Sequence, residues 1–285
     1  MRRFFLAAAM FAVVTGAHAA DMPDFLRGTL PASSTPTRNW DGWYAGGQVG
    51  YSSTSDDMST TVVGLTNQIF RGSNLAEPAS QLPLLGKVTS QGTGFGAFVG
   101  RNYQWDDVVL GIEANYNYIN LSAASSASIG PIQYTNLAGD NPPTGLTYLD
   151  DLALKGAATA TVRDAITFRG RAGWATGDFL PYMFGGLAVG RIDVTRTVTS
   201  NANREVLSST DGSFISYGPI AGVNTTVTQG RTNNFVAGWT AGLGLEYMVW
   251  GNVFVRGEWE YVKFLSVENT NVTLNSVRAG IGYKF

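Results

Sequence analysis

Apolar and polar residues alternate with a period of two in several stretches of the chain. The last stretch is the clearest: Val277, Ala279, Ile281, Tyr283 and Phe285 share one parity, and the residues between them are polar or glycine. Such alternation places the two sets on opposite faces of a β-strand. The pattern predicts eight strands, near residues 43–52, 93–103, 107–119, 163–175, 179–193, 234–248, 252–265 and 274–285.

The connections between these strands are unequal. The first, third and fifth are long and rich in Ser, Thr, Asn and Gly, the seventh is shorter, and the second, fourth and sixth are tight turns. Long extracellular loops alternate with short periplasmic turns in outer-membrane β-barrels. The sequence therefore predicts an all-β fold, an eight-stranded antiparallel up-and-down transmembrane barrel with long extracellular loops.

A soluble sandwich or a lipocalin-like barrel would also alternate. Two features argue against it. Strands of ten residues or more match a tilted membrane crossing, and long loops without structure are unusual in a compact soluble domain. One strand gives no orientation, because residues 180–192 are apolar on both faces.

The first twenty residues differ from the rest. Arg2 and Arg3 precede an apolar run that ends in small residues, which is typical of a cleaved signal peptide. We expect a signal peptide at 1–20, a proline-containing periplasmic leader at 21–42 and the barrel at 43–285. Export then places the protein in the bacterial outer membrane.

Composition narrows the chemistry. Of the 285 residues 14% are charged and 35 are glycine, none is cysteine, and the one histidine, His18, lies in the predicted signal peptide. Ser–His and Cys–His nucleophile pairs and histidine or thiolate metal sites are thus excluded after cleavage. The net charge of −2 gives no basic footprint for nucleic acid. We expect no catalytic residue, no metal and no cofactor, and a surface hydrolase or acyltransferase is the weakest hypothesis.

If the apolar parity faces lipid, the other parity faces the barrel interior. That face carries five cations and four anions: Glu113, Arg169, Arg171, Glu246, Arg256, Glu258, Glu260, Arg278 and Lys284. Unpaired buried charges are costly, so we expect a paired network. An eight-stranded barrel is only wide enough for side chains to fill it. The alternative is the lining of a narrow pore.

Several motifs carry a resemblance. The segment Trp40-Asp41-Gly42-Trp43-Tyr44-Ala45-Gly46 resembles the opening motif of a small outer-membrane β-barrel family common in alphaproteobacteria. These are porin-family or outer-membrane immunogenic proteins, related to the OmpA-like transmembrane barrel. Residues 167–173, 181–188, 238–247 and 277–285 are similar to later strands of that family.

The resemblance implies a structural and surface role in the cell envelope, with a narrow channel for small solutes as the alternative. It makes Phe285 the recognition signal for the barrel assembly machinery. Outer-membrane lipid and lipopolysaccharide are the implied surroundings, and the loops would meet any host or surface ligand. Haem binding, known in the family, would here have to use Tyr or Met.

Overall fold

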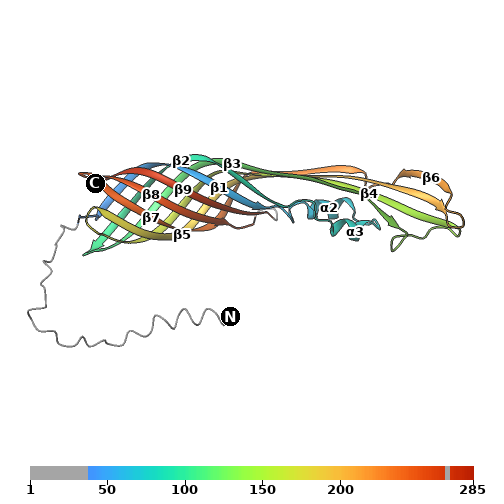
Figure 1. Ribbon diagram of the computed structural model, residues 1–285, viewed down its shortest axis with the longest axis horizontal. Helices are drawn as coiled ribbons and strands as arrows, with labels where there is room; N and C mark the ends of the chain where they lie inside the picture. The colour runs from blue at the N-terminus through green and yellow to red at the C-terminus, as the bar shows by residue number, and fades with distance from the viewer. Residues whose placement is uncertain (1–37, 267–269) are drawn as a thin grey trace, which may run out of the picture. The chain divides into compact units, whose positions relative to one another are not determined.

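The computed structural model describes residues 38–266 and 270–285. The predicted signal peptide and the leader up to residue 37 lie outside the described residues. Strands dominate the described part: β1 (Gly42–Asp57), β2 (Lys87–Trp105), β3 (Val108–Thr135), β4 (Leu146–Trp174), β5 (Phe179–Ser208), β6 (Phe214–Pro219), β7 (Thr225–Trp250), β8 (Val253–Phe264) and β9 (Asn271–Lys284) (Figure 1).

Eight of these strands close into a ring. The sheet order is β4-β3-β2-β1-β9-β8-β7-β5-β6, a further β4–β5 pairing closes the ring, and every pairing is antiparallel. Strand β6 stands outside the ring, because it pairs with β5 alone. The predicted eight-stranded antiparallel barrel is confirmed. We call the end with the short turns after β2, β4 and β7 the turn end, and the opposite end the loop end.

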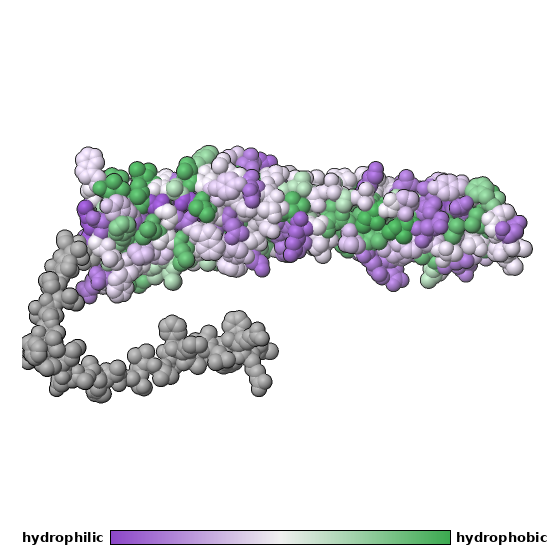
Figure 2. Space-filling model, in the orientation of Figure 1, coloured by the Kyte–Doolittle hydropathy of each residue, from purple (hydrophilic) through white to green (hydrophobic). Residues whose placement is uncertain are grey.

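The predicted faces are also confirmed. Apolar side chains such as Ile112, Phe168 and Val277 are exposed on the outside of the ring, and the residues between them are buried. The orientation that the sequence left open for 180–192 is resolved: Leu187 is 69% exposed, whereas Leu180 is fully buried. Figure 2 shows apolar residues over the outside of the barrel section.

Four strands are much longer than predicted. Strands β3, β4, β5 and β7 have 28, 29, 30 and 26 residues and run well past the ring (Figure 1). Beyond the ring they continue as a four-stranded sheet, which we call the extension: residues 121–135, 146–162, 194–208 and 225–231, with β6 at its edge. Much of what the sequence suggested to be long loop is therefore strand.

Irregular pairs mark the level at which the extension leaves the ring. The register shifts between Tyr118 and Leu121, between Val162 and Asp164, and between Ile192 and Val194. Asn120 and Asn233 have positive φ angles of 47° and 57° there. A β-bulge bends a strand and interrupts its alternation. The predicted strands have boundaries at 119, 163, 193 and 234 because the pattern is broken at these bulges.

The first long connection holds two short helices, α2 (Val63–Ile69) and α3 (Ala76–Ser80). They belong to an apolar cluster that also contains the inner face of the extension and the loop end of the barrel interior. Leu65 and Phe70 join Leu154, Val198 and Phe264 in this cluster. In the described residues, no helix has the length and hydropathy needed to cross a membrane.

Candidate functional site

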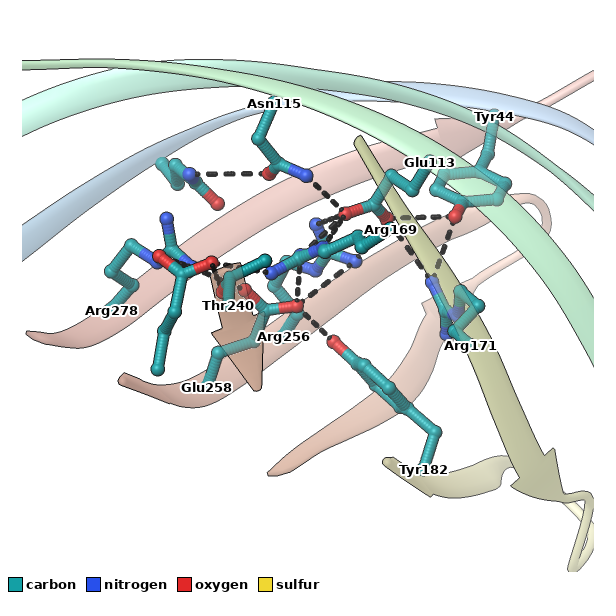
Figure 3. Close-up of polar contacts among 12 residues, drawn as sticks. Tyr44, Glu113, Asn115, Arg169, Arg171, Tyr182, Thr240, Arg256, Glu258 and Arg278 are labelled. Atoms are coloured by element: carbon teal, nitrogen blue, oxygen red, sulfur yellow. Dashed lines mark hydrogen bonds and ion pairs between the residues drawn. The ribbon is translucent and has the colours of Figure 1, made fainter. Parts of the chain in front are cut away.

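The charged residues of the inner face meet at mid-height in the ring. Glu113 on β3, Arg169 and Arg171 on β4, and Arg256 and Glu258 on β8 are all buried (Figure 3). They approach one another because inward-facing positions on opposite strands of a narrow barrel point at the same axis. Glu246 on β7, Glu260 on β8 and Arg278 on β9 complete a cluster that we call the lumen network.

Glu113 is the centre of this network. Its Oε1 accepts a hydrogen bond of 2.8 Å from Nε of Arg169 and one of 2.7 Å from Nδ2 of Asn115. Its Oε2 accepts hydrogen bonds of 2.7 Å from Nη2 of Arg256 and of 3.3 Å from Nη1 of Arg171. One carboxylate therefore holds three guanidinium groups.

The other three carboxylates contact these arginines and Arg278. Glu246 accepts hydrogen bonds of 2.9 Å from both Arg171 and Arg256. Glu258 accepts from Arg169 at 2.5 Å, and the carboxylate of Glu260 lies 2.6 Å from Nη2 of Arg278. Every arginine and every glutamate of the network thus has at least one opposite charge in contact.

Of the nine charged residues named from the sequence, the structure brings eight together. Lys284 lies apart at the turn end, where its Nζ donates to the backbone carbonyls of Asn39 at 2.7 Å and Asp41 at 3.1 Å. Without Lys284 the network holds four arginines and four glutamates and is neutral. Phe285 is exposed at the same end, and its backbone N–H donates to the carbonyl of Trp43.

Aromatic side chains missed in the sequence surround the network. The guanidinium carbon of Arg256 lies 3.8 Å from the ring centroid of Phe98, and that of Arg169 lies 3.9 Å from the centroid of Phe184. A Cβ on Gly46 would come within 2.4 Å of the Phe98 ring, so the glycine lets the ring lie against the wall. Cation–π contacts of this kind stabilise desolvated arginines.

Two tyrosines on the inner face extend the network. The hydroxyl of Tyr44 donates to Glu113 at 2.7 Å, and that of Tyr182 donates to Glu258 at 2.5 Å. Tyr44 lies between Trp43 and Ala45, which face outward, so the period-two alternation alone would have predicted that Tyr44 faces inward. Tyr182 had no such signal, because its segment is apolar on both faces.

The interior is filled above and below the network. At the turn end an apolar cluster includes Trp40, Phe254 and Leu180, and at the loop end the larger apolar cluster includes Val262 and Leu274. Between the network and the loop end lies a cavity of about 20 Å³, room for about one water molecule. Buried side chains of the two apolar clusters and of the lumen network therefore occupy the described barrel interior around this cavity.

The glutamates of the lumen network are all engaged by arginines. In the described residues no group of three or more His, Cys, Asp or Glu side chains could hold a metal ion. Glu258 and Glu260 share a face, as a glycosidase pair would, but each is bound to an arginine. The arrangement has a structural effect, because it neutralises charge inside the barrel.

This chain matches a family model and is similar to several known proteins. A family model described as outer membrane protein beta-barrel domain matches residues 5–285. The chain is similar to a 31 kDa outer-membrane immunogenic protein of Brucella melitensis (26% identity, covering 98% of this chain and 96% of that protein) and to a 25 kDa one of Brucella ovis (22%, covering 90% and 83%). Among solved structures it is similar to Neisserial surface protein A (14% identity, TM-score 0.33, covering 86% of this chain and 97% of that one).

Proposed function

The chain belongs to the family of outer-membrane β-barrel domains, and from that premise we propose that its barrel is a closed anchor that presents the extension at the cell surface. An outer-membrane protein of this family has its short turns in the periplasm and its long segments outside the cell. The extension then stands on the extracellular side, in the position from which a surface protein meets its surroundings.

The filled interior carries the proposal. Three layers of side chains occupy the lumen: the apolar cluster of the turn end, the neutral lumen network and the apolar cluster of the loop end. A solute would have to separate arginines from glutamates that are almost completely buried. Breaking buried ion pairs costs several kcal/mol each, so passive passage is strongly disfavoured.

Planar-bilayer recording of the purified, folded protein tests the proposal. We expect no steady conductance above the bare bilayer, while a known porin inserted under the same conditions conducts. The competing function is a narrow diffusion channel. Stable conductance steps that change in size with Arg171→Ala or Glu258→Ala would establish that channel and refute the closed anchor.

The proposed role includes no reaction. The carboxylates of the lumen network are held by arginines, and the sequence contains no cysteine and a single histidine. We therefore expect no turnover of lipid esters or peptides by the folded protein in detergent, measured against heat-unfolded protein as the blank.

Export and assembly complete the proposal. We infer that the signal peptide 1–20 is removed on export, that lipid and lipopolysaccharide surround the outward apolar band, and that the assembly machinery recognises Phe285. Its side chain is 73% exposed, which leaves it accessible. Deleting Phe285 should lower the yield of heat-modifiable protein in outer-membrane fractions, whereas Phe285→Tyr, which keeps an aromatic end, should not.

A further inference from the structure

The extension contains a polar pocket of about 290 Å³ that the barrel and its anchoring role do not use. Five separate segments form it: the end of α2 with the turn that follows it, the β3–β4 connection, β4, β5 and the β6–β7 connection. Its polar residues are Arg71, Ser73, Asn74, Asp140, Asp150 and Arg204.

The two acids of the pocket are already engaged. Nε and Nη2 of Arg204 donate to the two carboxylate oxygens of Asp150, each at 2.6 Å. Asp140 accepts from Nη2 of Arg204 and from Nδ2 of Asn74, both at 2.8 Å. The ring of Tyr148 lies 4.4 Å from the guanidinium carbon of Arg204. These contacts fix Arg204 and leave the acids little capacity to bind a cation.

The free capacity of the pocket is that of a hydrogen-bond donor. The hydrogen bonds of Arg204 in the described part of the chain use Nε and Nη2, and Nη1 is left available. Arg71 is exposed at the rim, and its side chain makes no ion pair or hydrogen bond in the described part of the chain. A guanidinium matches the two oxygens of a carboxylate, so two available arginine groups favour an anionic ligand.

The size and the floor of the pocket restrict that ligand further. Ligand pockets begin at about 300 Å³, so this one admits a molecule of about one sugar ring. Ile220 and Val223 give it a small apolar floor, suited to the C–H face of such a ring. We propose that this pocket binds a single acidic sugar residue, of the hexuronic or sialic acid class, with its carboxylate at Arg71 and Arg204.

Ligand-observed NMR on the full chain in nanodiscs tests this, with glucuronic acid, N-acetylneuraminic acid and glucose as probes. We expect at least one of the two acids to bind in the millimolar range and at least tenfold more tightly than glucose. Arg71→Ala should weaken that binding at least tenfold, because it removes one of the two guanidinium groups that would hold the carboxylate. The fold should be unaffected, since the Arg71 side chain makes no ion pair or hydrogen bond in the described part of the chain. Lys155→Ala, which removes another exposed cation of the extension, should leave binding unchanged.

A second variant separates charge from shape. Ala221 lines the pocket and is exposed, so Ala221→Phe should obstruct the pocket and abolish binding without a change in charge. Retained heat-modifiable migration shows that each variant is folded. Equal affinity for acid and glucose, no detectable binding of either acid, or unchanged binding in Arg71→Ala would overturn the proposal. Because conductance does not enter, the result is independent of the closed-anchor proposal.

Discussion

Four of the eight barrel strands continue into the extension, yet the apolar faces of the two regions point in opposite directions. On β4, Phe168 is exposed on the outside of the barrel and Arg169 is buried inside. Fourteen residues earlier on the same strand, Leu154 is buried and Lys155 is exposed. The inner face of β4 is therefore polar in the barrel and apolar in the extension.

The difference shows that the surroundings decide which face of a strand is apolar. Around the barrel the outside is hydrocarbon, so apolar side chains face out and the polar face closes on itself. Around the extension the outside is water, so the ordinary hydrophobic effect buries the apolar face against α2 and α3. The bulges beside Asn120 and Asn233 lie at the boundary between the two regimes.

The largest effect should follow from breaking charge balance in the barrel. Glu113→Gln removes the carboxylate that Arg169, Arg171 and Arg256 share. Removing one partner of a buried ion pair costs about 3–5 kcal/mol. We therefore expect a clear fall in the urea concentration at which half of the barrel is unfolded in detergent. Heat-modifiable gel migration measures the folded fraction at each urea concentration.

The same substitution in the extension is the control. Glu205 on β5 is half-buried, and Glu205→Gln should change the free energy of unfolding by less than about 0.5 kcal/mol. If Glu113→Gln prevents folding, Glu113→Gln with Arg171→Gln should recover part of the folded yield, since it restores neutrality. An unchanged midpoint for Glu113→Gln would contradict the importance of the network.

The next effect should appear only in the extension. Leu154→Ala removes a fully buried side chain from the apolar cluster beneath α2 and α3, at a cost of about 2–5 kcal/mol. We expect faster proteolysis of residues beyond the bulges while the barrel keeps its heat-modifiable migration. Lys155→Ala serves as the matched control. Loss of the barrel along with the extension would show that the two regions fold as one unit.

A pair of substitutions on the outer face of β5 compares the two surroundings directly. Leu187 faces outward on the barrel, and Thr195 is exposed eight residues later on the extension. Leu187→Arg should cost about 2–4 kcal/mol, because it places a charge against hydrocarbon. Thr195→Arg should cost about 0.5 kcal/mol or less, as surface changes in water do. Urea unfolding in lipid vesicles measures the loss in free energy of unfolding for each variant. Equal losses for Leu187→Arg and Thr195→Arg would contradict the conclusion that the outer face meets hydrocarbon in the barrel and water in the extension.

Period two, together with the alternation of long and short connections, predicted the ring, and period two placed the charged residues on its inner face. The alternation of Val277 through Phe285 assigned the faces of β9, and the same rule placed Glu113, Arg169 and Arg256 on the inside. The pattern contains no distances, so it could not separate Lys284 from the others. That residue is next to the chain end, where it reaches backbone carbonyls instead of the network.

The extension could not be predicted in the same way. The apolar residues of its strands face inward instead of outward, and bulges interrupt the alternation. An inner face of Ala158, Ala160 and Val162 beside an outer face of Ala157, Thr159 and Thr161 has little contrast in hydropathy. A bulge then shifts the register between Val162 and Asp164. The polar pocket was out of reach for another reason: Asn74, Asp140 and Arg204 are far apart in the chain and meet only after the long strands pair.

The smallest effect concerns Asp56, which lies where the two regions meet. Its carboxylate is buried near the end of β1, beyond Tyr51, the last aromatic residue of that strand that faces outward. Neither carboxylate oxygen has a hydrogen-bond partner among the described residues. Burial raises the pKa of Asp56 from 3.8 to about 7. In the lumen network every buried carboxylate has an arginine, and this one has none.

A raised carboxyl pKa means that the folded protein binds a proton that the unfolded chain has released. The contribution of Asp56 to stability should therefore be fully present below about pH 4, fall as the pH rises toward 7 and level off above it. Between pH 6 and pH 8 the expected loss is about 1 kcal/mol. Asp56→Asn keeps the shape without the charge, so its urea midpoint should be flat over this range and exceed that of the parent at pH 8. Parallel pH profiles for the parent and Asp56→Asn would mean that Asp56 ionises freely in the folded protein.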